Sequence, residues 1–153
     1  MSSTPPVQRL EHWTLVASNV DQTKQFYTQV LGAQEPQRSG GTGNGPVSVN
    51  LAGTIIDFFP AREDQKPSPG SGGQHHAYII NLEDYDPWVE HFEKLNVPIR
   101  RTTHGLGRMS IYVDDPDGYH IEFTVPFENT EIGRREIEKR GLLEQAGRRR
   151  RDA

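Results

Sequence analysis

The chain has 153 residues and no cysteine. Disulfide bonds and cysteine-built zinc sites are therefore excluded, and a reducing compartment is permitted. Long apolar runs are absent as well: the opening MSSTPPVQRL has no signal-peptide core, and no later stretch is long enough to cross a bilayer. These absences lead us to expect a cytoplasmic protein without membrane contact. A chain of this length can bury the core of one domain without such covalent support.

An excess of basic charge is also lacking. The chain has 17 Lys and Arg against 21 Asp and Glu, which gives a formal net charge of -4. Binding to nucleic acid needs a basic field over a large face, so no nucleic-acid partner is expected. The one strongly basic run, Arg148 to Arg151, follows Gly147 and has no aromatic residues to stack on bases, which indicates a solvated tail.

Residues 8–60 form the first of two predicted modules. EHWTLVASN alternates around β-forming residues and predicts a strand. A helix is expected next, with Asn19 as its cap and Gly32 as its end. SGGTGNG predicts a mobile loop, and PVSVNLA and GTIIDFFP predict two short strands. Residues 61–73, rich in Pro, Gly and Ser, are expected to link the two modules.

Residues 74–126 repeat this order. HHAYIINL predicts a strand, and Asp86 can cap a helix that has Pro87 at its first position. Three further strands are expected in VPIRRTT, RMSIYVDD and GYHIEFTVP, the last two joined by an Asp-Pro-Asp-Gly turn. We interpret each module as β-α-β-β-β, and the pair as an internal duplication.

Residues 127–153 lie beyond the duplication and predict a helical extension followed by the basic tail. Thr130 is the expected cap of a helix that ends at Gly141 and is too polar to be core. Four apolar side chains are expected to pack on the domain's own edge or on a second subunit: Ile132, Ile137, Leu142 and Leu143.

Both modules carry a histidine on their first strand and a carboxylate on their last. His12 corresponds to His75 or His76 at an offset of 63 or 64, and Asp57 corresponds to Glu122 at an offset of 65. Two such modules paired around a pseudo-twofold axis would bring these groups together. The predicted fold class is therefore α+β, with two tandem modules that pair into a curved mixed-sheet trough around a central metal site.

Two imidazoles and a carboxylate suit a borderline divalent ion and leave coordination positions open for substrate or oxygen. Asp57 as a fourth ligand would favour an ion that acts as a Lewis acid on a substrate oxygen. The expected cofactor is a divalent metal ion, Fe or Mn, or alternatively Zn or Ni, because these ligands suit all four.

Three segments carry a family resemblance: HWTLVASNVDQTKQFYTQVLG, HHAYII and IYVDDPDGYHIEF. With the β-α-β-β-β order over residues 8–126, the chain resembles the vicinal oxygen chelate superfamily, which includes glyoxalases, extradiol dioxygenases, fosfomycin-resistance enzymes and bleomycin-resistance proteins. The resemblance implies His12, His75 and Glu122 as metal ligands, and a homodimer. Asp57 stands where glyoxalases carry a glutamate as fourth ligand, and is shorter by one methylene. His76 remains an alternative to His75, because neighbouring strand residues point to opposite faces.

Three further polar residues are candidate catalytic groups. His120 shares the face of Glu122 and is expected to be an acid-base group, a partner of a metal ligand or a rim histidine. Tyr112 can donate a proton to a bound oxygen or simply pack within its strand. His104 lies on a glycine-flexible loop that can close over a pocket. Three arginines either steer an anionic substrate or form a solvated edge: Arg100, Arg101 and Arg108.

The predicted function is that of a metal-dependent enzyme acting on a small molecule with adjacent oxygens. The favoured hypothesis is an extradiol-type ring-cleaving dioxygenase, with four aromatic residues lining a flat pocket: Trp13, Phe58, Tyr78 and Phe123. A glyoxalase-like isomerase or lyase using Zn(II) or Ni(II) is the first alternative, and it needs Asp57 as a ligand. A fosfomycin-type thiol transferase and a non-enzymatic binding protein of the bleomycin-resistance kind are further alternatives. Retention of three candidate ligands favours an enzyme over a binding protein.

Overall fold

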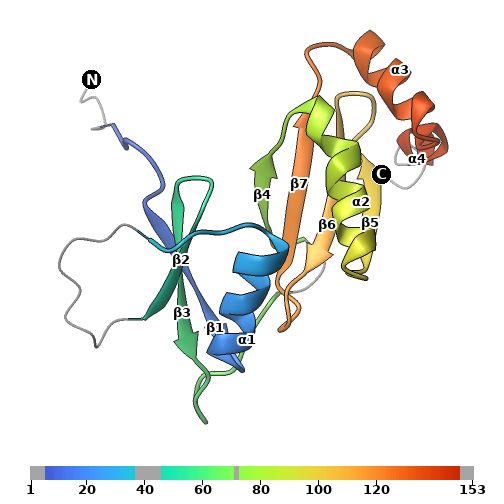
Figure 1. The fold of residues 1–153 in the computed structure, drawn as a ribbon. Coiled ribbons are helices and arrows are strands. Elements are labelled where there is room, and N and C mark those ends of the chain that lie inside the picture. Colours follow the sequence, from blue (N-terminus) through green and yellow to red (C-terminus); the bar gives the residue numbers. More distant parts are fainter. Residues whose placement is uncertain (1–5, 37–45, 71–72, 149–153) are drawn as a thin grey trace. The chain divides into compact units, whose positions relative to one another are not determined.

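A computed structural model describes residues 6–36, 46–70 and 73–148. The chain forms two compact units, residues 1–68 and 69–153, and each is considered by itself (Figure 1). The predicted mobile loop at 39–45 and the basic residues after Arg148 lie outside the described residues. Within the described ranges, no helix is long and apolar enough to cross a membrane.

The first unit is a three-stranded sheet with one helical segment. Its strands are β1 (His12–Ala17), β2 (Val47–Leu51) and β3 (Thr54–Pro60), in the order β1-β3-β2. Strand β3 is parallel to β1 and antiparallel to β2. In the expected β-α-β-β-β order, the strand that directly follows the helix is reduced, within the described residues, to a single bridge between Gln34 and Asn50.

The helical segment of the first unit begins where the sequence predicts and then changes its winding. Asn19 caps α1 (Val20–Gln25) by accepting a hydrogen bond from the Gln22 backbone N at 3.0 Å. A π-helical turn, η1 (Phe26–Val30), follows, and Leu31 N donates to Phe26 O at 3.3 Å. Gly32 then ends the segment with φ of 74°, as expected for a left-handed stop.

The second unit has the full β-α-β-β-β order. Its strands are β4 (His75–Ile79), β5 (Ile99–Thr103), β6 (Arg108–Asp114) and β7 (His120–Pro126). The sheet order is β4-β7-β6-β5, with β4 and β7 parallel and the other neighbours antiparallel (Figure 1). This register confirms the duplication, because Asp57 lies opposite Thr14 in one unit and Glu122 lies opposite Ala77 in the other.

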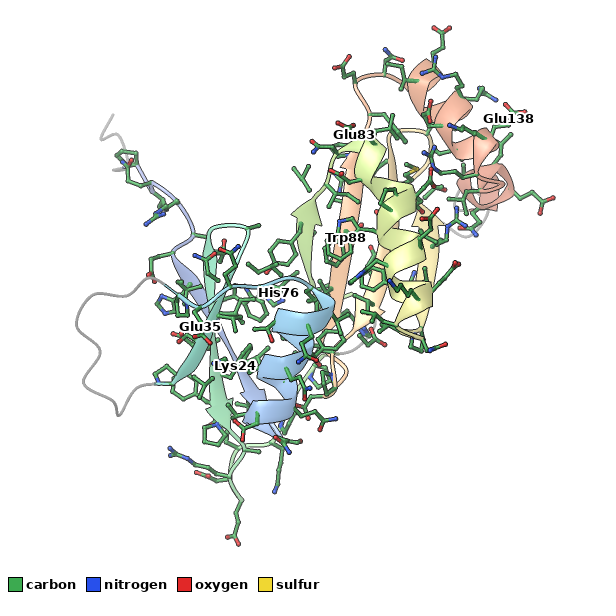
Figure 2. The ribbon with its side chains drawn as sticks, in the orientation of Figure 1. Lys24, Glu35, His76, Glu83, Trp88 and Glu138 are labelled. Carbon is green, nitrogen blue, oxygen red and sulfur yellow. The ribbon has the colours of Figure 1, made fainter. Side chains whose placement is uncertain are left out.

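One face of this second sheet is covered by α2 (Tyr85–Lys94). The rings of Trp88 and Phe92 lie 4.6 and 5.7 Å from that of Phe123, and Figure 2 shows Trp88 between the helix and the strands. Tyr78 also lies beside Phe123, at 6.2 Å. The prediction that Tyr78 and Phe123 line a pocket is therefore wrong, since both pack on the helix side of the sheet.

The start of α2 differs from the sequence-based expectation. The cap is Asp84, not Asp86, because a 3-10 turn, η2 (Leu82–Asp84), leads directly into the helix. Pro87 is consequently the third helical residue. It is tolerated there because backbone N–H groups of the first turn have no intrahelical partner.

The extension forms α3 (Thr130–Lys139) and α4 (Leu143–Arg148). The cap of α3 is Asn129, whose Oδ1 accepts from Glu131 N and Ile132 N at 3.1 and 3.0 Å, so the predicted cap at Thr130 is off by one residue. One face of α3 is buried at Gly133, Glu136 and Ile137, and Leu142 after it is 5 % exposed, so Ile137 and Leu142 pack on the chain's own second unit, as one of the two predicted alternatives has it.

The two modules, each a mixed sheet with a helix, confirm the α+β fold class. Alternation along the strands gives the second sheet two different faces. Apolar residues such as Ile111, Ile121 and Phe123 face α2, whereas the residues between them carry the polar groups of the site.

Candidate active site

Glu122 is the centre of a polar cluster on the face of the second sheet that α2 does not cover. Its side chain is only 2 % exposed, although it carries a carboxyl group. His75 Nε2 lies 2.8 Å from its Oε2, and His104 Nε2 lies 3.2 Å from its Oε1. Two imidazoles therefore converge on the two oxygens of one buried carboxylate, which satisfies the hydrogen-bonding needs of that group.

This geometry distinguishes His75 from His76. In β4 the His75 ring points to Glu122, and His76 lies one residue on and so belongs to the opposite face. Burial, with the neighbouring His75 charge, lowers the pKa of His76. Of the two adjacent histidines, only His75 is brought to the carboxylate.

Tyr112 borders the same cluster from β6, where it lies directly opposite Glu122. Its hydroxyl is 3.4 Å from His104 Nε2, and its ring meets the His75 ring edge to face at 5.5 Å. The guanidinium of Arg100 on β5 lies 4.2 Å from the centre of the Tyr112 ring. Glu122, Tyr112 and Arg100 thus form a row across three neighbouring strands.

The protonation of Glu122 reflects competing effects. Burial alone would raise its pKa, but hydrogen bonds from the hydroxyls of Ser110 and Tyr112 and the charges of His75 and His104 lower the pKa below its usual value. The carboxylate form is therefore favoured, as a metal ligand or an anionic hydrogen-bond acceptor requires. Ser110 was missed at the sequence level, although its position two residues before Tyr112 places it on the same strand face.

His104 reaches the cluster from the loop that joins β5 to β6. The loop is tight: His104 N donates to Arg108 O at 3.0 Å, and Gly105 has φ of 63°. The sequence predicted that this histidine sits on a loop near a pocket. Its contact with Glu122 depends on the path of the loop, which spacing along the chain does not encode.

His120 lines the pocket without touching Glu122. Its Nδ1 lies 2.6 Å from Asp114 Oδ1, and the two residues are opposite each other in β6 and β7. The pocket has a volume of about 460 Å³ and is lined by His75, Arg100, His104, Tyr112 and His120 together with Gly73 and Gln74. This volume is within the range of small-molecule sites.

The two candidates in the first unit have local partners. Asp57 Oδ1 accepts a hydrogen bond from Ser48 Oγ at 2.5 Å, and Asp57 is 5 % exposed. His12 Nδ1 lies against the carboxylate of Glu11. Phe58, expected to line a pocket, is fully buried beside Tyr27, with the rings 5.2 Å apart.

A divalent ion is compatible with the donor types at the second-unit cluster. His75 and Glu122 provide an imidazole nitrogen and a carboxylate on one face, which are the ligand types such ions take. Within the ranges 6–36, 46–70 and 73–148 no three such side chains have the spacing of a formed metal site, and His75 and Glu122 are hydrogen-bonded to each other instead.

Known proteins provide an independent comparison. Residues 9–123 match the model of the Glyoxalase/Bleomycin resistance protein/Dioxygenase superfamily. Virulence protein STM3117 of Salmonella typhimurium is 29% identical over 125 residues, covering 77% of this chain and 84% of that protein. Glutathione transferase FosA of Serratia marcescens is 29% identical over 119 residues, covering 78% and 82%.

A solved structure shares the fold. The fosfomycin resistance protein FosX of Listeria monocytogenes, complexed with Mn(II) and 1S,2S-dihydroxypropylphosphonic acid, has a TM-score of 0.65 at 23% identity, and the match covers 83% of this chain and 98% of that one. Members of the superfamily use divalent metal ions. Together with the duplicated module and its register, the match over residues 9–123 shows that the chain belongs to the Glyoxalase/Bleomycin resistance protein/Dioxygenase superfamily.

Proposed function

We propose that the protein is a metal-dependent dioxygenase that opens the ring of a catechol beside its two hydroxyl groups. One observation carries the proposal: His104 Nε2 lies 3.2 Å from a Glu122 oxygen and 3.4 Å from the Tyr112 hydroxyl. His104 and Tyr112 can both carry protons, and they lie beside Glu122, which we propose binds the metal together with His75. Such groups are expected where a substrate must lose protons on binding.

The proposed metal ligands are His75 and Glu122, with His12 as the further histidine and Asp57 as an optional fourth ligand. A bound Fe(II) or Mn(II) ion would supply coordination of the two catechol oxygens and of O2. Ring cleavage of this type places both atoms of O2 in the product, so it needs no added reductant.

The chain's own residues account for the proton steps. We assign to His104 the role of accepting a proton from one substrate hydroxyl, in the neutral tautomer that leaves Nε2 unprotonated, because Nε2 is the ring nitrogen that lies beside Glu122. Tyr112 can donate its hydroxyl proton to an oxygen that gains charge. Glu122 fixes the orientation of both imidazoles, and His120, paired with Asp114, lies at the pocket wall.

Oxygen uptake tests this proposal. The full chain is loaded anaerobically with Fe(II) and mixed with a panel of catechols in an oxygen electrode, beside His104→Gln and Tyr112→Phe variants. We expect the His104 variant to lose on the order of a hundredfold in kcat, with the metal content unchanged. His91→Gln is the matched control, because His91 lies on α2, on the other side of the sheet, where its ring meets the Trp88 ring edge to face. An iron-loaded protein that consumes no oxygen with any catechol contradicts the proposal.

A second candidate is addition of a thiol to a small anionic epoxide. It is supported by the similarity to a protein named glutathione transferase FosA and by the arginine at the pocket. Loss of fosfomycin in the presence of glutathione and Mn(II) measures it directly. A glyoxalase-like isomerase or lyase using Zn(II) or Ni(II), with Asp57 as a ligand, is a further alternative.

A further inference from the structure

Arg100 contributes a positive charge to the pocket. Among the three arginines considered at the sequence level, only Arg100 lines the cavity. Arg101 points to the opposite face, where its Nε lies 3.4 Å from the Tyr85 hydroxyl. Arg108 is exposed on β6. Arg100 therefore belongs to the pocket, whereas Arg101 and Arg108 do not line it.

The carboxylates near the pocket already have partners. Glu122 is held by His75 and His104, and Asp114 is held by His120. Within the described part of the chain, no salt bridge involves Arg100, and its guanidinium rests on the Tyr112 ring. A guanidinium stacked in this way keeps its N–H donors available at its edge, where a planar anion can bind through two hydrogen bonds.

The pairing of β5, β6 and β7 indicates where that anion would lie relative to Glu122. Arg100 is opposite Tyr112, and Tyr112 is opposite Glu122, so Arg100 is two strands away from the carboxylate of the cluster. Two strand spacings amount to roughly 9–10 Å between backbones. An aromatic ring with its hydroxyls at Glu122 and His75 would thus extend over Tyr112 toward Arg100.

We propose that Arg100 selects substrates with a carboxylate on the ring edge remote from the two hydroxyls, such as 3,4-dihydroxybenzoate. This inference rests on the proposed function for the identity of the ring, but the anion site itself depends only on Arg100 and the pocket. Arg100 is a specificity residue in this proposal, and it takes no part in proton transfer.

Binding measured by calorimetry under anaerobic conditions on the full-length protein as purified tests the proposal without turnover. The ligands are 3,4-dihydroxybenzoate and 4-methylcatechol, which differ in the carboxylate. We expect Arg100→Gln to lower the ratio of the two affinities by about tenfold to a hundredfold, the usual effect of losing a charge-assisted pair. Arg100→Lys should retain part of the preference, because it keeps the charge and loses the planar fork.

Arg108→Gln is the matched control, because it removes the same charge from an exposed position of the same sheet, and its affinity ratio should equal that of the wild type. An equal affinity ratio in wild type and Arg100→Gln overturns the proposal, as does a lack of binding by 3,4-dihydroxybenzoate.

Oxygen uptake distinguishes a failure of the anion site from a failure of the proposed reaction. A ratio that depends on Arg100 in a protein without oxygen uptake supports the anion site and rejects the dioxygenase. Oxygen uptake with an unchanged ratio rejects the anion site alone.

Discussion

Gly133 of α3 lies directly against the backbone of Leu106: a Cβ placed on Gly133 would stand 1.9 Å from Leu106 O and 2.9 Å from the Phe127 ring. Leu106 belongs to the loop that carries His104. The same loop is held from another side, where Phe127 N donates to Gly107 O at 2.9 Å. The C-terminal extension therefore packs on the loop that delivers a candidate catalytic histidine.

Gly133→Ala should consequently displace this loop. In an exposed helix this change would stabilise the protein by up to about 1 kcal/mol, because alanine has the higher helix propensity. Here the added Cβ meets a backbone carbonyl, and the clash should destabilise the folded protein by about 1–3 kcal/mol. We expect a lower thermal midpoint and, if His104 acts as proposed, a larger loss in kcat than in KM. Arg134→Ala, at the exposed neighbouring position, is the control. A Gly133→Ala protein with an equal or higher midpoint would show that α3 does not press on the loop.

The two adjacent histidines of β4 provide a paired test of metal binding. His75→Ala removes the imidazole that lies 2.8 Å from Glu122 and should abolish uptake of Fe(II) or Mn(II), measured by elemental analysis after reconstitution. His76→Ala changes a residue on the opposite face, and its metal content should match the wild type. His12→Ala extends the test to the first unit. Normal metal content in the His75 variant would reject the proposed ligand set.

The strands of the second unit and their polar and apolar faces could be predicted from the sequence, because alternation in segments such as HIEFT records burial on one side. The correspondence of Asp57 with Glu122 followed from the same patterns. The choice between His75 and His76 could not be made, because a shift of one residue exchanges the faces of a strand. Only the observed pairing with β7 fixes which ring meets Glu122.

Other features depend on contacts between residues remote in sequence. The place of His104 depends on a loop with Gly105 at positive φ and on α3 packed against it. Burial of α3, whose composition is polar, depends on Arg140 and Asp86, 54 residues apart. The capping errors at Asp86 and Thr130 have a local cause: neighbouring residues of similar capping ability compete, and the adjacent backbone decides between them.

Arg140 should be essential for the docking of α3. Its side chain is 7 % exposed, and it pairs with Asp86 and Glu136 at 2.8 Å each. Arg140→Ala leaves the buried Glu136 with the exposed Arg135, 3.1 Å away, but without its buried partner. The unfolding free energy should fall by roughly 2–4 kcal/mol, somewhat less than for a fully buried pair because Asp86 is half exposed. Urea titration measures this loss, and Lys139→Ala, exposed at the preceding position, should have little effect in it. An equally stable Arg140→Ala protein would show that the helix is held by its apolar contacts alone.

Asp115 of the Asp-Pro-Asp-Gly turn should contribute more to the stability of the second unit in mild acid than at neutral pH. Asp115 Oδ1 accepts hydrogen bonds from Asp117 N and Tyr119 N, both at 2.9 Å, and the side chain is buried. Burial raises the pKa of its carboxyl from 3.8 to about 6, although those hydrogen bonds act in the opposite direction. The folded state therefore holds this proton more tightly than the unfolded state does.

The sign of the effect follows from this difference. The contribution of Asp115 is fully present below pH 3.8 and is lost as the pH rises through about 6. At 1.36 kcal/mol per pKa unit the loss is at most about 3 kcal/mol. Asp115→Asn keeps an oxygen acceptor but does not titrate. The unfolding free energy of the variant relative to wild type should therefore increase between pH 4 and 7 by about 1–3 kcal/mol.

Urea unfolding followed by tryptophan fluorescence measures this difference in the second unit. The chain has two tryptophans, so a Trp13→Phe background leaves Trp88, which packs against Phe123, as the reporter. Glu138→Gln, exposed on α3 (Figure 2), controls for the loss of one negative charge elsewhere in the unit. A stability difference between Asp115→Asn and wild type that stays constant over this pH range would mean that the carboxyl titrates alike in the folded and unfolded chain, and that its burial in the turn carries no electrostatic cost.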